Sequence, residues 1–254
     1  MMMHGAFSLQ DKVAIVTGCA TGLGQGMSLG LAEAGALIAG VYNKSTPSCG
    51  DEIESLGSRF IGIKADLADL ANVEKVVETA VEAYGRVDIL VNNAGIIRRQ
   101  PALEFTLENW DNVLDINLRS LFFLCQAAAR RFVLQKSGGK IINIASMLSF
   151  QGGILVPSYT ASKSGVMGLT RELACEWAAE NINVNGIAPG YMATENTRAL
   201  QEDPVRSKDI LKRIPANRWG QPEDLKGAVV FLASSASDYI NGHTLAVDGG
   251  WLCR

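Results

Sequence analysis

Tyr159 and Lys163 are the residues of this sequence whose types and spacing point most directly to chemistry. Side chains four positions apart in a helix lie on one face, so the phenol and the ammonium are expected within reach of each other. A neighbouring cation favours the phenolate and lowers the pKa of a phenol from its usual value of about 10. The pair is therefore predicted to act as a general acid or base, provided that the chain also binds a reactive partner beside it.

A glycine-rich loop, Thr17–Gly24, follows the apolar run Val13–Thr17. Glycines in such a loop allow a sharp turn, a close approach of the backbone to a pyrophosphate, and tight packing of the next helix on the strand. The helix N-terminus then holds phosphates through its free N–H groups and its dipole. The alternative is a glycine-rich turn that binds nothing. The predicted dinucleotide-binding residues of this loop are Gly18, Thr21, Gly22, Leu23 and Gly24.

The end of the second apolar run, Val41–Lys44, bears on the choice of nicotinamide cofactor. An acidic side chain at this place binds the ribose 2′-hydroxyl of NAD and repels the 2′-phosphate of NADP. Val41–Lys44 contains no acid, and Lys44 could bind a 2′-phosphate or simply lie in solvent. The missing acid would admit NADP, whereas the glycine loop carries no basic residue to bind its 2′-phosphate. The residues alone therefore leave both cofactors open.

Alternating strands and helices must position these residues. Buried parallel strands read as short apolar runs, and amphipathic helices as apolar stripes with a period of about 3.6 residues. Strands are predicted at 13–17, 37–42, 60–64, 87–91, 140–145, 182–187 and 245–247. Helices are predicted at 27–34, 72–84, 107–135 (one long helix or a broken pair) and 157–180. The pattern predicts an α/β fold, a doubly wound, Rossmann-like parallel sheet of about seven strands with helices on both faces, in one domain spanning 1–254.

A polar stretch at 190–221 interrupts this alternation after the sixth predicted strand. In open α/β sheets, ligands bind outside the carboxyl ends of the strands, which is where this stretch begins. We therefore expect a substrate lid there rather than a separate domain.

Composition excludes several classes of function. The net charge of −3 and the lack of a basic face argue against a nucleic acid partner. No apolar run is long enough to span a membrane, and residues 1–11 lack the features of a signal peptide, so we expect a cytoplasmic protein. The two histidines, His4 and His243, offer almost no material for a metal site or a Ser-His-Asp triad. The cysteines are expected as free thiols: Cys19, Cys49, Cys125, Cys175 and Cys253.

Several motifs fall in order across almost the whole chain: Thr17–Gly24, Asn92-Asn93-Ala94-Gly95, Ser146 thirteen residues before Tyr159, Tyr159-x-x-x-Lys163, and Pro189-Gly190. In this order they resemble the short-chain dehydrogenase/reductase family. The resemblance implies a Rossmann-like fold and an oxidoreductase that interconverts a secondary alcohol and a ketone with a nicotinamide cofactor.

The resemblance also implies catalytic roles. Tyr159 would be the general acid or base, and Lys163 would lower its pKa and bind the nicotinamide ribose. Ser146 would donate a hydrogen bond to the substrate oxygen. Asn117 would hold a water next to Lys163 and complete a proton relay. Alternatively, Ser146 could cap a strand end and Asn117 could bend its helix by bonding to backbone.

Contacts with the cofactor follow from the same resemblance. Asp66 would meet the adenine amino group, although it could instead be a helix N-cap. Asn93 and Gly95 would line the adenosine side, and Thr194 would hold the carboxamide. The implied cofactor-binding set outside the glycine loop is Asp66, Leu67, Asn93, Ala94, Gly95, Tyr159, Lys163, Pro189, Gly190 and Thr194.

The expected substrate is a small sugar acid. The runs 141–153, 188–194 and 248–251 resemble one family member that acts on a deoxy sugar acid. Arg98 and Arg99 follow the fourth predicted strand and would bind the carboxylate, unless they are solvated or lie at a subunit interface. Gln151 would bond a sugar hydroxyl, and Ser146 and Tyr159 would hold the reacting oxygen. Surface or packing roles are expected for the lid residues Tyr191, Met192, Arg198, Arg213 and Trp219.

The sequence thus predicts hydride transfer between a nicotinamide cofactor and a secondary hydroxyl or ketone of a deoxy sugar acid. The resemblance, together with the lack of a basic residue in the glycine loop, favours NAD over NADP. The resemblance also implies a homotetramer with contacts through 107–135 and 157–180. One alternative is an NADPH-dependent 3-oxoacyl thioester reductase, to which Arg98-Arg99 and the polar lid are less suited. Another is a non-catalytic dinucleotide-binding module, which would usually have lost the Tyr159 or Lys163 that this chain keeps.

Overall fold

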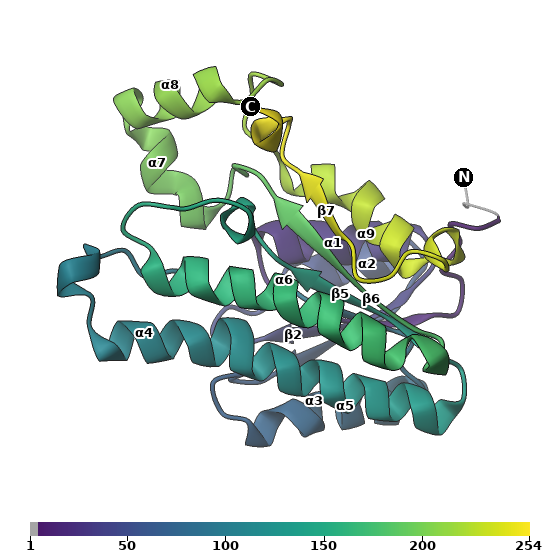
Figure 1. Cartoon of the computed structure of the whole chain (residues 1–254). Helices are drawn as coiled ribbons and strands as arrows, with labels where there is room; N and C mark the ends of the chain where they lie inside the picture. The colour runs from purple at the N-terminus through teal and green to yellow at the C-terminus, as the bar shows by residue number, and fades with distance from the viewer. Residues whose placement is uncertain (1–4) are drawn as a thin grey trace.

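Seven parallel strands form one sheet in the computed structural model, which describes residues 5–254 (Figure 1). His4 and the first residues of the predicted domain lie outside the described part. The strand order is β3-β2-β1-β4-β5-β6-β7, so the chain reverses direction across the sheet between β1 and β4. The strands are Val13–Thr17 (β1), Leu37–Tyr42 (β2), Phe60–Lys64 (β3), Ile89–Asn92 (β4), Gly139–Ile144 (β5), Ile182–Pro189 (β6) and Thr244–Val247 (β7). Ligands bind at such a switch point, outside the carboxyl ends of the strands.

Helices cover both faces of the sheet, which confirms the doubly wound prediction (Figure 1). One apolar core joins the sheet to α3 (Ala71–Tyr84), α5 (Ser120–Gln135) and α6 (Pro157–Trp177). A second core joins it to α1 (Gly22–Glu33), α2 (Cys49–Ser55) and α9 (Lys226–Ala233). Every residue of β1 is buried because helices lie on both of its sides.

Most predicted boundaries shift by a few residues, and two predicted helices differ from the structure more strongly. The first helix begins at Gly22 rather than Met27, so the last glycines of the expected loop belong to its first turn. The region 107–135 contains α4 (Leu107–Leu114), a π-helical turn at Asp115–Arg119, and then α5. A π-helical turn widens the helix by one residue and occurs often at functional sites.

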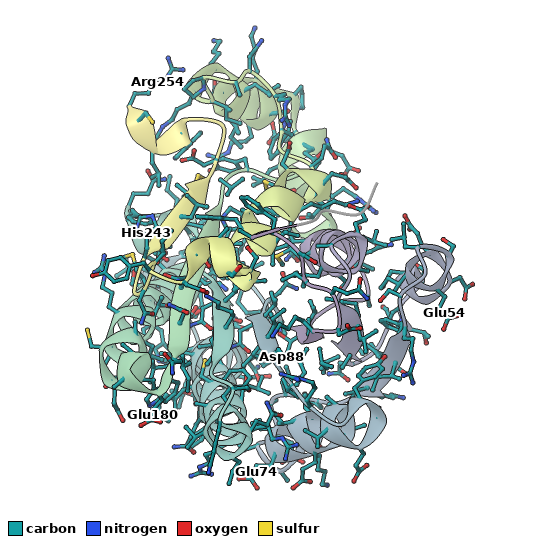
Figure 2. The ribbon with its side chains drawn as sticks, turned by 90° about the vertical axis from the view of Figure 1, so that its right-hand side faces the viewer. Glu54, Glu74, Asp88, Glu180, His243 and Arg254 are labelled. Carbon is teal, nitrogen blue, oxygen red and sulfur yellow. The ribbon has the colours of Figure 1, made fainter. Side chains whose placement is uncertain are left out.

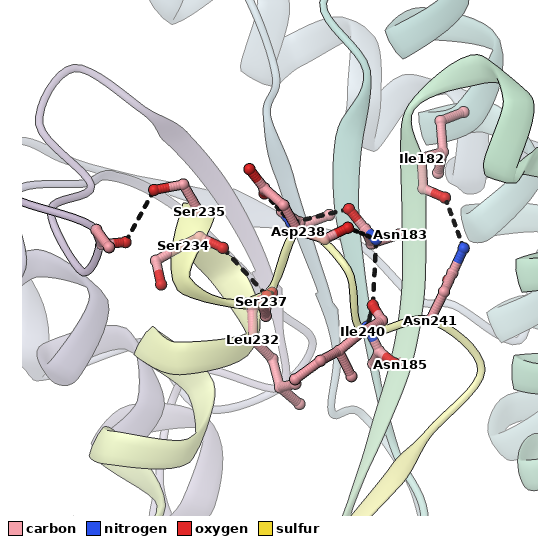
Figure 3. A network of polar contacts seen from close by, with 12 residues as sticks. Ile182, Asn183, Asn185, Leu232, Ser234, Ser235, Ser237, Asp238, Ile240 and Asn241 are labelled. Atoms are coloured by element: carbon pink, nitrogen blue, oxygen red, sulfur yellow. Dashed lines mark hydrogen bonds and ion pairs between the residues drawn. The ribbon is translucent and has the colours of Figure 1, made fainter.

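A polar network joins β6 to the segment before β7, at the end of the strands opposite the expected site (Figure 3). The Asn183 side-chain amide donates to the Asp238 and Ile240 carbonyls, at 3.0 and 3.1 Å. The Asn185 amide also donates to the Ile240 carbonyl, at 2.8 Å. These bonds tie β6 to the segment that leads into β7, and thereby set the position of the residues that follow β7.

Two short helices stand above the carboxyl ends of the strands, beside the C-terminus (Figure 1). They are α7 (Arg198–Glu202) and α8 (Pro204–Arg213), within the stretch predicted as a lid. Asp203 caps α8, since its carboxylate accepts from the backbone N–H groups of Val205 and Arg206 at 2.9 and 3.0 Å.

Candidate active site

The glycine loop makes a tight turn between β1 and α1. Gly18 has a φ of +67°, a backbone conformation that L side chains rarely adopt. A Cβ on Gly24 would lie 2.1 Å from the Gly18 carbonyl oxygen, so the loop closes only with glycine there. The Gly18 N–H donates to the Val41 carbonyl at 2.9 Å, which brings the loop beside the end of β2.

Thr17 and Asn93 fasten this loop to the segment after β4. The Thr17 hydroxyl accepts from the backbone N–H groups of Asn93 and Ala94, both at 2.9 Å. The Asn93 side-chain amide donates to the Thr17 and Gly18 carbonyls, at 2.9 and 3.1 Å. The Asn93 side chain thus shapes the loop from within. Thr17 had no predicted role, although its place directly before the first glycine was a usable signal.

The N-terminus of α1 is suited to bind phosphate. Thr21 is its exposed, extended N-cap residue, and the following N–H groups of the first turn have no intrahelical acceptors. A Cβ on Gly22 would lie 3.4 Å from the Thr194 methyl carbon, so Thr194 faces the loop across a narrow gap. Leu23 packs against the core beneath α1. A glycine-rich backbone at the start of a helix leaves room for a dinucleotide pyrophosphate.

The residues predicted to contact the adenosine differ in their exposure to solvent. Asp66 is exposed, and its carboxylate accepts from the Ala68 N–H at 3.0 Å. Asp66 therefore caps a turn and is not the N-cap of α3, which begins five residues later at Ala71. Leu67 is buried in the core, and Lys44 is exposed after β2.

Ser146, Tyr159 and Lys163 come together where β5 ends against α6. The Ser146 hydroxyl accepts from the Leu148 N–H at 3.2 Å. Ser149 links the two elements, because its hydroxyl donates to the Lys163 carbonyl at 2.6 Å and accepts from the Ser146 N–H at 3.3 Å. Sequence reasoning missed Ser149, which carries no motif of its own.

Lys163 is deeply buried, with 4 % of its surface exposed. Its ammonium lies 5.8 Å from the centre of the Tyr159 ring and donates to the Ile144 carbonyl at 2.5 Å. Burial lowers the pKa of Lys163 to about 8. Lys163 can therefore exchange a proton near neutral pH.

The expected acidification of Tyr159 by Lys163 is wrong for the protein alone. Burial raises the pKa of Tyr159 above its usual value, and the Ser146 hydrogen bond and the Arg99 charge only partly oppose this. Lys163 does not offset this effect of burial, because its ammonium is directed to the Ile144 carbonyl.

Asn117 lies fully buried in the π-helical turn. Its side-chain oxygen accepts from the Ile96 N–H at 2.8 Å, and its amide donates to the Ile96 carbonyl at 3.0 Å and to the Ser162 hydroxyl at 3.2 Å. It therefore holds the segment after β4 against α6, rather than bending its own helix. Gly95 lies beside it, since a Cβ there would be 3.2 Å from the Asn117 oxygen.

A cavity of about 710 Å³ opens above Ser146 and Tyr159. Arg99, Gln151 and Gly190 also line it, together with residues of α7 and α8. Arg98 is not among the lining residues, and its guanidinium donates to the Ile97 carbonyl at 3.3 Å. The structure thus brings all the predicted substrate-binding residues except Arg98 to one cavity.

Pro189 and Gly190 form the junction between the sheet and this cavity. Pro189 is the last residue of β6, and Gly190 lies against the segment after β7. A Cβ on Gly190 would be 2.5 Å from the Asp248 Cα, so only glycine permits this approach.

Tyr191 and Trp251 contribute aromatic rings to the wall of the cavity. The Trp251 and Tyr191 rings are 4.7 Å apart between centroids, and Tyr191 also meets Trp219 at 5.6 Å. Tyr191, Trp251 and Arg213 line the cavity, whereas packing or surface roles were expected for Tyr191 and Arg213. The sequence places these residues far from Ser146, so only the fold shows their position.

Comparison with known proteins shows relatives along the full chain. A family model described as "Enoyl-(Acyl carrier protein) reductase" matches residues 18–252. A 2-dehydro-3-deoxy-D-gluconate 5-dehydrogenase of Dickeya dadantii is 62% identical over 253 residues, and all of both chains is covered. The protein of the same name from Bacillus subtilis is 54% identical, with 99% of each chain covered. A gluconate 5-dehydrogenase from Burkholderia cenocepacia, solved with NADP and tartrate, superposes with a TM-score of 0.92 at 40% identity and covers 98% of each chain.

Proposed function

The chain belongs to the short-chain dehydrogenase/reductase family and is an oxidoreductase, and from this premise we propose that it is a 2-dehydro-3-deoxy-D-gluconate 5-dehydrogenase. The observation that carries the proposal is the meeting of Ser146 and Tyr159 in one cavity with three arginines, Arg99, Arg206 and Arg213. A hydroxyl and a phenol suit a reacting alcohol, and arginines suit a carboxylate. The identity to relatives of that name supports the substrate.

The residues of the site divide the proton chemistry between them. When bound, the nicotinamide supplies the acceptor or donor of the hydride. Ser146 would hold the substrate oxygen by a hydrogen bond, and Tyr159 would take the proton from the hydroxyl during oxidation. Because a positively charged ring favours the phenolate, the oxidised cofactor would also lower the pKa of Tyr159.

Lys163 and Asn117 would then carry the proton away. The pKa of Lys163, about 8, allows its ammonium to release a proton near neutral pH. Asn117 binds both the Ile96 backbone and the Ser162 hydroxyl of α6. We propose that a water held beside these groups passes the proton to solvent.

NAD is the proposed cofactor, as the glycine loop carries no basic side chain for a 2′-phosphate. Lys44, exposed after β2, is the residue that would admit NADP. The Burkholderia cenocepacia relative was solved with NADP. The kcat/KM of this protein should therefore be measured with both NAD and NADP.

Further proposals concern the whole molecule. Residues 190–221 would act as a substrate lid, since α7 and α8 line the cavity. A homotetramer would form through α4, α5 and α6. The first two carry exposed apolar side chains: Leu107, Trp110, Val133 and Leu134. We also propose a cytoplasmic location. Within residues 5–254, no helix is both long and apolar enough to cross a bilayer.

A substrate panel tests the proposed function. We expect the purified protein to oxidise 2-dehydro-3-deoxy-D-gluconate with NAD, and to reduce 3-oxoacyl thioesters slowly or not at all with NADPH. Faster turnover of the thioester than of the sugar acid would support the alternative reductase. Absence of turnover with every pair of substrate and cofactor would favour a binding module.

A further inference from the structure

Arg213 faces the substrate cavity from the end of α8. It lines the cavity together with Ser146 and Tyr159, and its guanidinium donates to the Gln151 side-chain oxygen at 3.2 Å. Gln151 follows Ser146 by five residues and lines the same cavity. The contact therefore bridges the lid and the segment that carries Ser146.

The Arg213 side chain is held in place before any ligand binds. Its guanidinium carbon lies 3.9 Å above the Trp251 ring, a stacking contact between a cation and an aromatic face. Trp251 is itself buried, with 4 % of its surface exposed, and packs against Tyr191. A guanidinium held between Trp251 and Gln151 loses little further side-chain entropy when it binds an anion.

The C-terminal residue also fixes the backbone of Arg213. Arg254 lies at the same end of the molecule as α8 (Figure 2). Its guanidinium donates to the Arg213 carbonyl at 3.2 Å and to the Lys212 carbonyl at 2.5 Å. These are carbonyls of the last turn of α8, which have no partner within the helix, so Arg254 caps the helix that carries Arg213.

The charge of Arg213 has no paired carboxylate among residues 5–254. Two other arginines of the lid region form salt bridges, Arg198 with Glu195 and Arg218 with Asp224. Arg213 forms none, although Asp209 lies one turn earlier in α8 and lines the same cavity. Arg206 of α8 also lines the cavity and forms no salt bridge, but only the Arg213 side chain is held there by Trp251 and Gln151. A guanidinium that faces a cavity and has no carboxylate partner is suited to bidentate binding of an anion.

Arg99, the cavity arginine predicted from the sequence to bind the carboxylate, occupies a different place. Its charge acts on Tyr159, and its guanidinium donates to the Asn196 carbonyl at 3.0 Å. Arg99 therefore lies by the reacting group. In a six-carbon acid oxidised at C5, four carbon–carbon bonds separate that carbon from the carboxylate. The carboxylate thus belongs at the end of the cavity away from Tyr159.

Building on the proposed function, we propose that Arg213, held by Trp251 and Gln151, binds the substrate carboxylate and makes the enzyme select acids over neutral sugars. Arg99 then contacts the end of the substrate next to the reacting hydroxyl. The role assigned to Arg213 is one of specificity and not of proton transfer.

Arg213→Met tests this proposal, because methionine keeps an apolar stem on Trp251 and removes the charge. Lys212→Met is the matched control, since Lys212 precedes Arg213 in α8 and its side chain is not among those lining the cavity. KM and kcat are measured for 2-dehydro-3-deoxy-D-gluconate and for its primary amide, which has nearly the same size and no charge. Arg213→Met is expected to raise KM for the acid about 10–100-fold and to change KM for the amide less than about threefold.

Lys212→Met is expected to match the wild type on both substrates. Arg213→Lys keeps a charge, so its KM for the acid should fall between those of the wild type and Arg213→Met. Thermal unfolding and cofactor binding establish that each variant is folded. Equal changes for acid and amide, no change for either, or an Arg213→Lys variant as impaired as Arg213→Met would overturn the proposal. Wild-type protein that turns over neither substrate would instead reject the proposed function.

Discussion

Lys163→Met is expected to abolish turnover and yet to stabilise the fold. Burial lowers the pKa of Lys163 from 10.5 to about 8, so keeping the ammonium charged at pH 7 costs the folded state about 3 kcal/mol, at about 1.4 kcal/mol per pH unit. Methionine has a similar length and removes this cost. Loss of the bond to the Ile144 carbonyl returns about 1–2 kcal/mol of it. The net gain of about 1–2 kcal/mol corresponds to a rise in Tm of roughly 2–8 °C.

The stability difference between the wild type and Lys163→Met should depend on pH. Between pH 8 and 10.5 the unfolded chain holds the Lys163 proton and the folded chain releases it, so the wild type gains stability as pH rises through that window. The methionine variant lacks this gain, while other titrating groups are common to both proteins. Thermal unfolding of both across this range should show a Tm difference that is largest at pH 7 and shrinks towards pH 10.5. A less stable variant at pH 7, or a difference independent of pH, would refute the reasoning.

Three further predictions concern the cofactor and the cavity. Gly24→Ala places a methyl 2.1 Å from the Gly18 carbonyl, so it should cost about 1–3 kcal/mol of stability and weaken cofactor binding; unchanged Tm and cofactor fluorescence would contradict the tight-loop argument. Arg99→Met removes a charge that lowers the pKa of Tyr159, so the rise of kcat/KM with pH during oxidation should move to higher pH, and an unmoved profile would count against that coupling. Lys44→Glu should reduce kcat/KM with NADP relative to NAD by about tenfold, and an unchanged ratio would show that Lys44 lies away from the ribose.

Local patterns made much of the fold predictable. β1 reads as a continuous apolar run because helices bury both of its faces. Gly18 is required by its own backbone φ of +67°, and Gly24 by the Gly18 carbonyl six residues earlier. Tyr159 and Lys163 are neighbours through helical geometry alone. Each of these signals lies within one stretch of sequence.

Features that depend on distant contacts could not be predicted. The π-helical turn surrounds Asn117, whose partner Ile96 lies 21 residues away. Burial in the folded protein raises the pKa of Tyr159, and the spacing of residues in the sequence does not reveal that burial. Arg213 looked like a surface residue because Gln151, 62 positions away, reaches it only in the fold.

Turnover of 2-dehydro-3-deoxy-D-gluconate by the wild type and by Tyr159→Phe tests the central claim most directly. Phenylalanine keeps the ring beside Lys163 and removes only the hydroxyl that would take the proton. Formation of reduced nicotinamide is followed by absorbance, and cofactor binding by fluorescence. The account predicts oxidation by the wild type, and a variant that binds cofactor normally with kcat lowered about 100-fold or more. A variant that oxidises the sugar acid as fast as the wild type would contradict it.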